Sequence, residues 1–378
     1  MDLKGARLFI LSNASGYGGS ERSVELLAPA LSRYFFLTIF PENDIHLKNL
    51  HHLRDSRIEV VPFRKGRSAR VTLKNLWILH GYICDRKPMA ILANSNKGAF
   101  YLSIYSHLRS LKGIKLFLYI RDYEWKHIRF MAHSIGKATV LVPSAAVLEK
   151  PNYCHIIIGK DGDRRECHRE CVIIPDPVSL PNNELDGQGK ECSQDTPIVL
   201  CLAAVTRWKG LDYLIKAFAM IPFDKLGAKL VIRGIFHDSE YLHELKGLIH
   251  TLNLSRQVDL GEFTNKVEDL YRCAAVVVSS SISAHGGPET FGRTIIEAWS
   301  HRKPVLSFRV GGPKYLIDDG VDGILVEEGN IEEMASKLCE LLENRFLRKS
   351  MGENGFDKVK NNYTTERVAW SLAELINR

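Results

Sequence analysis

The chain is 378 residues long, about twice the usual size of one domain, so we expect two domains. Apolar residues make up 45% and charged residues 25%, which excludes a largely disordered chain. Its apolar stretches, such as 274–278, are too short to span a membrane, and the first residues lack a secretory pattern. The eight cysteines include no CxxC pair. We therefore expect a soluble, cytoplasmic protein with reduced thiols.

Basic residues gather in the first part of the chain. Residues 1–150 hold 23 Lys and Arg against 11 Asp and Glu, whereas residues 151–378 hold 28 against 33. The excess is concentrated between Arg54 and Lys87, which favours an anionic partner, either a nucleic acid or the headgroups of a membrane surface. A solvated basic face without a partner is the alternative. The region offers mainly Phe63 and Trp77 for base stacking, which disfavours nucleic acid.

The first half alternates predicted strands with helical segments. A buried strand at 8–11 leads into a glycine-rich loop at 15–20, and residues 21–32 then carry apolar residues at helical spacing. Short apolar runs typical of strands follow at 35–40, 58–61, 90–93, 115–120 and 139–142. This alternation predicts a parallel sheet that is covered by helices on both faces.

A segment rich in proline, glycine and asparagine, 175–197, interrupts the alternation and predicts an exposed linker. The alternation then restarts, with strands predicted at 198–203, 229–232, 258–260, 275–278, 305–308 and 324–326. We therefore predict an α/β fold of two doubly wound, Rossmann-like domains. They would face a cleft, and ligands would bind there near the carboxyl ends of the strands.

Two glycine-rich loops precede helices. In the first, Gly16, Gly18 and Gly19 suit an anion at a helix N-terminus. Glu21 stands where a dinucleotide fingerprint needs glycine, and a Walker A loop is absent. A tight turn without a ligand is therefore the alternative for this loop.

The second loop, 286–292, combines carboxylates with a helix start. Glu289 in the loop can accept hydrogen bonds from hydroxyl groups, and Glu297 on the helix can accept a pair from a ribose. The N–H groups from Phe291 to Arg293 can hold phosphate. These parts predict a nucleotide-sugar site. The alternative is that Glu297 pairs with Arg293 at i,i+4 and that Glu289 caps the helix.

The chain resembles the glycosyltransferase family 4 enzymes of GT-B architecture. Residues 289–297 are similar to the family's Glu-x7-Glu element, 18–22 resemble its Gly-Gly-x-Glu-Arg loop, and 172–178 resemble its interdomain strand and turn. Further similar segments are 209–214, 303–306, 311–313 and 319–326. The resemblance implies an acceptor-binding domain at 1–178 and a nucleotide-sugar domain at 179–362. It also implies that a helix at about 363–378 packs back onto the first domain.

The resemblance implies roles by position. Glu289 would contact the hydroxyl groups of the donor sugar, and Glu297 would contact the ribose. Lys209, with the backbone at Gly18 and Gly19, would stabilise the leaving diphosphate. The donor site implied in this way also includes Thr290, Phe291, Gly292 and Arg293.

The chain departs from the family pattern at two points. The usual Gly-Arg pair before the lysine is replaced by 203–204, so Arg207 or Arg233 would supply the missing cation. Arg207 is favoured because it shares a loop with Lys209. Many relatives have a histidine followed by Asp near the donor sugar, where this chain has Arg121 and Asp122. Arg121 would then contact sugar or phosphate.

Two clusters raise the question of a metal. Asp161 and Asp163 lie in a polar stretch that we interpret as a surface loop. Cys154, Cys167 and Cys171, with nearby histidines, lack the common two-residue knuckle and a clear fourth ligand. We therefore expect no metal and no cofactor, with a UDP- or GDP-linked sugar as the donor substrate.

The resemblance implies a retaining enzyme that transfers a hexose to a saccharide or lipid-linked saccharide acceptor, in cell-envelope polysaccharide or glycolipid synthesis. The basic region 54–87 fits peripheral placement on the anionic inner face of a membrane. Two alternatives stay open: a nucleotide-sugar 2-epimerase of the same architecture, and a non-enzymatic nucleic-acid-binding protein that uses the basic half. Of these partners, we expect the membrane rather than nucleic acid.

Overall fold

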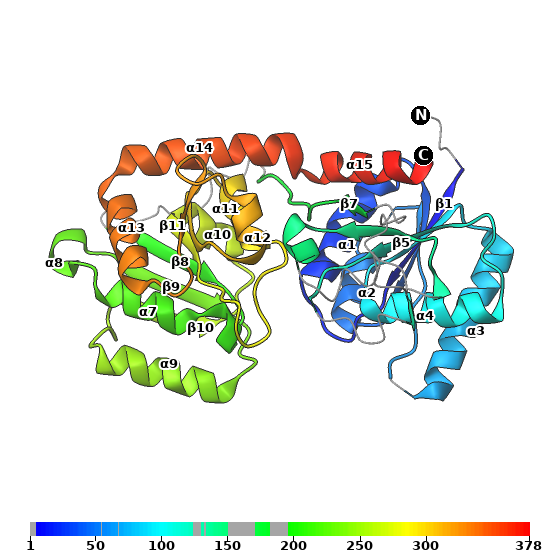
Figure 1. Cartoon of the computed structure of the whole chain (residues 1–378), viewed down its shortest axis with the longest axis horizontal. Helices are drawn as coiled ribbons and strands as arrows, with labels where there is room; N and C mark the ends of the chain where they lie inside the picture. Colours follow the sequence, from blue (N-terminus) through cyan, green and yellow to red (C-terminus); the bar gives the residue numbers. More distant parts are fainter. Residues whose placement is uncertain are drawn as a thin grey trace, which may run out of the picture. The chain divides into compact units, whose positions relative to one another are not determined.

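The computed structural model describes residues 5–53, 55–66, 68–123, 130–131, 134–149, 171–181 and 196–378 (Figure 1). The chain divides into two compact units, Met1–Pro177 with Thr365–Arg378, and Val178–Thr364. Each unit is built on one parallel sheet with helices on both faces, so the predicted α/β fold class is confirmed. In the described ranges no helix is both long enough and apolar enough to cross a membrane.

The sheet of the first unit has the order β3-β2-β1-β4-β5-β6-β7, and its neighbouring strands pair in parallel. Its strands are β1 (Arg7–Ser12), β2 (Phe36–Pro41), β3 (Ile58–Val60), β4 (Ala90–Ala93), β5 (Lys115–Tyr119), β6 (Thr139–Val142) and β7 (Cys171–Ile173). The order reverses between β1 and β4, which is where α/β sheets bind ligands at their carboxyl edge.

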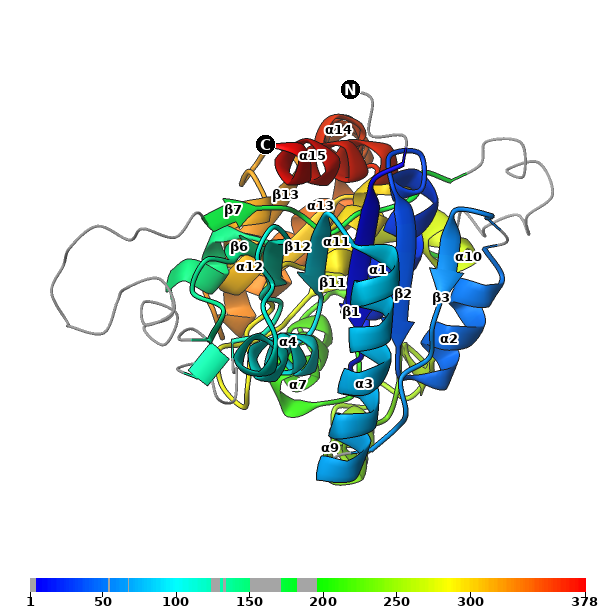
Figure 2. The same cartoon turned by 90° about the vertical axis from the view of Figure 1, so that its right-hand side faces the viewer.

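Helices cover both faces of this sheet (Figure 2). The helices are α1 (Gly19–Leu31), α2 (Asp44–His51), α3 (Ala69–Arg86), α4 (Asn96–Leu108) and α15 (Thr365–Asn377), with a 3₁₀ turn η1 (Ala145–Glu149). Leu8 and Ile10 of β1 are buried in a core with α1 and α15, whereas Phe9 and Leu11 are buried in a second core with α3 and α4. The alternation of side chains along a strand accounts for this division.

The last helix of the chain belongs to the first unit. Val368, Leu372 and Ile376 of α15 are buried in the core that contains α1. Lys115 of β5 donates a hydrogen bond to the carbonyl oxygen of Ile376 at 3.0 Å. The final turn of α15 is thereby tied to the amino end of β5.

The sheet of the second unit has the order β10-β9-β8-β11-β12-β13, again with parallel pairing. Its strands are β8 (Ile198–Leu202), β9 (Lys229–Gly234), β10 (Val258–Glu262), β11 (Ala274–Ser279), β12 (Val305–Phe308) and β13 (Gly323–Val326). The reversal lies between β8 and β11. Within the predicted linker, Val178 donates its N–H to the carbonyl oxygen of Tyr363 at 2.8 Å, so this residue is part of the second unit.

The second unit carries helices on both faces of its sheet. They are α7 (Leu211–Ala219), α8 (Phe223–Leu226), α9 (Ser239–Thr251), α10 (Val267–Cys273), α11 (Arg293–Ser300), α12 (Gly311–Leu316), α13 (Ile331–Glu343) and α14 (Arg345–Asn362), with a 3₁₀ turn η3 (Arg207–Lys209). Trp299 of α11 is fully buried and donates its indole N–H to the carbonyl oxygen of Asp322 at 2.8 Å. A Cβ at Gly355 would lie 2.1 Å from this indole ring, so the close approach of α14 to α11 at this point requires glycine.

Candidate functional site

The loop before α11 is held by close backbone contacts at the carboxyl edge of the second sheet. Gly292 has φ of 109°, which favours glycine, and a Cβ there would lie 2.9 Å from Cδ1 of Ile295. A Cβ at Gly312 would lie 2.3 Å from the carbonyl oxygen of Phe291, and the Gly312 N–H donates to the carbonyl oxygen of Glu289 at 2.7 Å. These contacts place the first turn of α11 at the sheet edge, and within that turn the N–H of Ile295 donates to the carbonyl oxygen of Gly292 at 3.0 Å.

The predicted residues Thr290 and Phe291 lie in this same loop. The side chain of Thr290 is half-buried. The Phe291 ring is 3% exposed and lies edge-on to Tyr363, with ring centroids 6.0 Å apart. The Phe291 ring is therefore part of the core of the second unit and is not available to a ligand.

The structure brings together Lys209 and Glu289, which are 80 residues apart in the chain. They form an ion pair, and Nζ of Lys209 lies 3.8 Å from the centroid of the Trp208 ring. The two side chains are 14% and 21% exposed, so solvent screens the pair only in part. Ser280 Oγ donates to the carbonyl oxygen of Lys209 at 2.9 Å, which ties η3 to the end of β11. A cation and a carboxylate thus lie beside the loop that precedes α11.

Glu297 has two donors within its own unit. Tyr271 donates its hydroxyl to Oε2 at 2.9 Å, and Arg293 donates to Oε1 at 3.2 Å. Burial, followed by the charge of Glu297, raises the pKa of Tyr271 well above its ordinary value, so this hydroxyl remains a donor. The predicted i,i+4 pair with Arg293 is therefore present. Because Glu297 is 27% exposed, its carboxylate is also open to solvent.

The two candidate replacement cations are engaged elsewhere. Arg207 donates two hydrogen bonds to Glu244 of α9, at 2.9 and 2.7 Å. Arg233 donates to Asp259 of β10, at 2.5 Å to the carboxylate and 2.9 Å to the carbonyl oxygen. Both guanidinium groups are thus paired with carboxylates of α9 or β10, whereas the ammonium group of Lys209 is paired with Glu289.

Two exposed apolar residues follow neighbouring strands and were not singled out in the sequence. Ile235 comes directly after β9 and is 49% exposed, and Phe263 comes directly after β10 and is 59% exposed. Parallel strands place these positions at the same edge of the sheet as Lys209. A large apolar residue three positions after the end of each predicted strand, 229–232 and 258–260, was the available signal.

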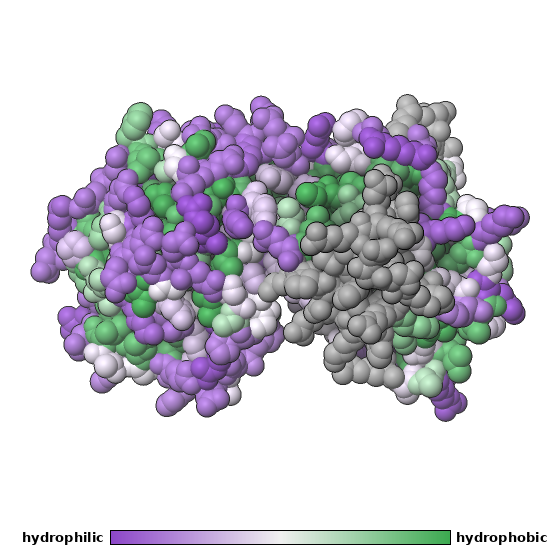
Figure 3. All heavy atoms as spheres, viewed as in Figure 1, coloured by the Kyte–Doolittle hydropathy of each residue, from purple (hydrophilic) through white to green (hydrophobic). Residues whose placement is uncertain are grey.

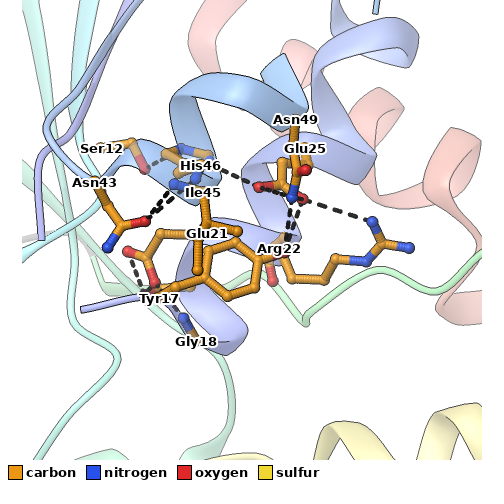
Figure 4. Close-up of polar contacts among 12 residues, drawn as sticks. Ser12, Tyr17, Gly18, Glu21, Arg22, Glu25, Asn43, Ile45, His46 and Asn49 are labelled. Carbon is orange, nitrogen blue, oxygen red and sulfur yellow. Dashed lines mark hydrogen bonds and ion pairs between the residues drawn. The ribbon is translucent and has the colours of Figure 1, made fainter. Parts of the chain in front are cut away.

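The glycine-rich loop of the first unit is held by Glu21 (Figure 4). The N–H of Gly18 donates to Oε2 of Glu21 at 2.9 Å, and the Ser20 hydroxyl donates to the same carboxylate at 2.9 Å. Burial raises the pKa of Glu21. In this conformation the side chain of Glu21 therefore satisfies the Gly18 N–H, and the role of the Gly18 and Gly19 backbone in binding a diphosphate stays a prediction. An anion at this loop would have to use other donors, such as the N–H of Gly19.

A second network behind the same loop joins α1 to α2 (Figure 4). Tyr17 donates its hydroxyl to Oε2 of Glu25 at 3.0 Å, and Asn49 donates to the same oxygen at 3.1 Å. His46 is fully buried, with Nδ1 2.8 Å from Glu25 Oε1 and Nε2 3.0 Å from Ser12 Oγ. Burial acts to raise the pKa of Glu25, but hydrogen bonds from His46, Asn49 and Tyr17 outweigh it and lower this pKa. The network fixes the position of Tyr17 in the loop.

Arg121 lies in the interior of the first unit. Its guanidinium forms an ion pair with Asp176, donates through Nε to Oδ1 of Asn94 at 3.0 Å, and lies 3.6 Å from the centroid of the Tyr119 ring. Asp176 also accepts a hydrogen bond from Ser23 at 2.7 Å. Arg121 is 9% exposed. In this conformation the residue joins β5 to the segment that follows β7.

Several predicted positions lie outside the described residues. These are Arg54, Arg67, Cys154, His155, Asp161, Asp163, Cys167 and His168. Cys171 is described and is the partly buried first residue of β7. Within the described ranges, no group of three or more His, Cys, Asp and Glu is placed to hold a metal ion.

Comparisons with known sequences relate the second half of the chain to glycosyltransferases. Residues 184–358 match the family model described as glycosyl transferases group 1. Lipopolysaccharide core biosynthesis glycosyltransferase LpsE of Rhizobium meliloti is 26% identical over 182 residues, 48% of this chain and 50% of its own length. Capsular polysaccharide biosynthesis glycosyltransferase CapM of Staphylococcus aureus is 26% identical over 198 residues, 52% of this chain and 50% of its own length. The chain thus spans about half the length of these relatives.

A solved structure is similar to nearly the full length of this chain. Anabaena Alr3699/HepE, crystallised in complex with UDP, has a TM-score of 0.79 and 20% identity, over 98% of this chain and 99% of its own. This likeness extends over both units and confirms the predicted GT-B fold.

Proposed function

We propose that this chain, with a glycosyl transferases group 1 segment on a GT-B fold, is a retaining glycosyltransferase. It transfers a hexose from a UDP- or GDP-linked sugar to a saccharide or lipid-linked saccharide acceptor, and it uses no metal. The observation that carries the proposal is the pairing of Lys209 with Glu289 beside the start of α11. The names of LpsE and CapM support a role in cell-envelope polysaccharide or glycolipid synthesis.

The proposed chemistry centres on the leaving diphosphate. The bond from the anomeric carbon to the phosphate oxygen breaks, and its electron pair stays on that oxygen. Lys209 and the first N–H groups of α11 stabilise the developing negative charge. Without donor, Glu289 balances the charge of Lys209. With donor bound, the diphosphate takes over as counter-ion, and Glu289 accepts hydrogen bonds from the sugar hydroxyls.

The acceptor then attacks from the face that the diphosphate leaves. Its oxygen bonds to the anomeric carbon, and its proton passes to the leaving phosphate oxygen. This course keeps the anomeric configuration and needs no enzymic nucleophile. Retention rests on the family resemblance of residues 289–297, and the geometry of Lys209 and Glu289 is compatible with it.

The nucleotide is bound by the second unit in this proposal. The carboxylate of Glu297, oriented by Tyr271 and Arg293, accepts hydrogen bonds from the ribose hydroxyls. The exposed side chains of Ile235 and Phe263 give the base an apolar surface, because an aromatic ring and a base stack through their faces.

The first unit binds the acceptor in this proposal. Exposed cations of the region 54–87, among them Arg64, Arg70 and Lys74, support peripheral attachment to the anionic inner face of a membrane in the cytoplasm. The enzyme would bind a lipid-linked acceptor at that membrane surface.

The deciding experiment is a screen of UDP-glucose, UDP-galactose, UDP-N-acetylglucosamine and GDP-mannose. A donor at about 100 times its Kd stabilises the folded protein by about 2.7 kcal/mol, which we expect to raise the Tm by roughly 5–10 °C. The best donor is then tested with saccharide acceptors in EDTA, and the product anomer is assigned by NMR. A Tm that no donor raises would refute the donor site, and an inverted anomer would refute retention. Conversion of the donor to its 2-epimer without acceptor would favour the epimerase instead.

A further inference from the structure

One face of α3 is buried and the opposite face carries exposed apolar side chains. Leu76, Leu79 and Ile83 pack into the core of the first unit. On the outer side, Trp77 is 78% exposed and Leu73 is 62% exposed. In Figure 3, green apolar and purple hydrophilic side chains lie together at the surface over α3.

Cations share this outer face. Arg70, Leu73, Lys74 and Trp77 recur at helical spacing, so their side chains project on one side of α3. We call these four residues the α3 ridge. The one acidic residue of α3 is Asp85 in its last turn, which pairs with Arg86 at 3.3 Å and not with the ridge.

A further cation is held beside the ridge by a buried amide. Asn75 is fully buried, accepts a hydrogen bond from the N–H of Arg64 at 2.8 Å and donates to the carbonyl oxygen of Arg64 at 2.9 Å. The backbone of Arg64 is therefore fixed against α3. The side chains of Arg64, the ridge residues and Ile78 line one shallow depression.

The presence of both charged and apolar side chains on the α3 ridge favours one kind of partner over others. Cations alone would bind any anion, but burial of Trp77 and Leu73 requires a partner that is also apolar where it meets the α3 ridge. An anionic bilayer offers both, with phosphates at its surface and hydrocarbon beneath, and tryptophan favours that interface. Single-stranded nucleic acid is bound through a series of stacking aromatics, whereas the ridge has one aromatic ring and an aliphatic side chain.

We propose that the α3 ridge inserts Trp77 and Leu73 into the interface of an anionic bilayer while Arg64, Arg70 and Lys74 contact headgroup phosphates. The inference rests on the proposed function, because it specifies how the acceptor domain reaches the membrane. The inserted side chains of Trp77 and Leu73 add an apolar contribution to the electrostatic attraction between the cations and the membrane. Salt screens the cations but not the inserted side chains, so part of the binding persists at high ionic strength.

The test uses the full chain and vesicles of phosphatidylcholine with or without roughly 30% phosphatidylglycerol, sedimented in about 0.1 M and about 0.5 M NaCl. We expect binding to the anionic vesicles and little to the neutral ones. The double variant Leu73→Ala/Trp77→Ala should lose at least tenfold in affinity, including all of the salt-resistant binding. Arg70→Gln/Lys74→Gln should lose mainly the binding at low salt.

Matched controls separate a general surface effect from the ridge. Phe346 in the second unit is 82% exposed, so Phe346→Ala removes an equally exposed apolar side chain and should bind vesicles as the unmodified chain does. Lipids brominated on their acyl chains should quench tryptophan fluorescence of the unmodified chain, and Trp77→Phe should abolish that quenching. Titration of each variant with whichever of UDP and GDP binds the unmodified chain verifies that the second unit is unaffected.

Vesicle binding that is the same with and without Leu73 and Trp77 would overturn the proposal, as would quenching that persists in Trp77→Phe. Binding of a single-stranded oligonucleotide without vesicle binding would assign the ridge to nucleic acid and also overturn it. Failure of both UDP and GDP to bind the unmodified chain would refute the proposed donor site but would not change the vesicle result. The two failures are therefore distinguishable.

Discussion

We expect the substitution Glu297→Ala to weaken nucleotide binding while the protein stays folded. Each carboxylate oxygen of Glu297 takes one donor from its own unit, Tyr271 at 2.9 Å or Arg293 at 3.2 Å. A carboxylate oxygen can accept a second hydrogen bond, so two ribose hydroxyls can be held at once. The alanine variant removes both of these contacts.

The size of the effect follows from the charge and exposure of Glu297. A hydrogen bond to a charged group contributes about 1.5–3 kcal/mol, and the 27% exposure of this side chain favours the lower end. Two such bonds amount to about 3 kcal/mol, so Kd should rise by roughly 100- to 200-fold. Calorimetric titration with UDP and with GDP measures this directly.

A conservative variant provides the control. Tyr271→Phe keeps the carboxylate but removes the hydroxyl that orients it, so we expect a smaller rise in Kd than for Glu297→Ala. Unchanged nucleotide affinity in Glu297→Ala, together with a lower free energy of unfolding, would refute the reasoning. Glu297 would then be only the structural partner of Arg293 and Tyr271.

Three further predictions concern catalysis and stability. Lys209→Ala should lower kcat more than donor affinity, because the charge of the leaving group is greatest in the transition state. Steady-state kinetics in EDTA measure both quantities. Activity that depends on added magnesium would contradict the mechanism. Burial, followed by the charge of Arg348, lowers the pKa of Lys303 to about 8. Between pH 8 and about 10.5 the unfolded chain therefore binds more protons than the folded chain does. The free energy of unfolding should rise with pH by about 3 kcal/mol across that window. Denaturant titrations should show this increase for the unmodified chain and not for Lys303→Met. Gly355→Ala should destabilise the second unit by about 1–3 kcal/mol because its Cβ would meet the buried indole, whereas Gly247→Ala, on an open face of α9, should be neutral or stabilising in the same titration.

Local sequence patterns predicted the strands well because buried parallel strands are short, continuous apolar runs. The predicted strands 90–93, 139–142 and 305–308 coincide with β4, β6 and β12 residue for residue. The strand β7 was indicated only by the family resemblance of 172–178, since its three residues are too few to form a pattern.

The site was less predictable because its contacts join distant residues. The pair of Glu297 with Arg293 follows from helical spacing, but the hydroxyl of Tyr271 comes from another helix, α10, and is invisible in the local sequence. The occupation of the Gly18 N–H by Glu21 is a capping box, which the spacing of the two residues could have indicated. The burial of His46 beside Glu25 depends on how α1 packs on α2, which no local pattern predicts.

The membership of α15 in the first unit has a consequence for how the chain folds during synthesis. Without α15, the apolar face of α1 and β1 that Val368, Leu372 and Ile376 cover would be open to water. The first unit therefore stays incomplete on the ribosome while residues 178–364 are made, which takes about 10–40 s at 5–20 residues per second. Throughout that time a nascent chain exposes an uncovered core, which is a target for chaperones. The second unit is continuous in sequence and can complete its own core first.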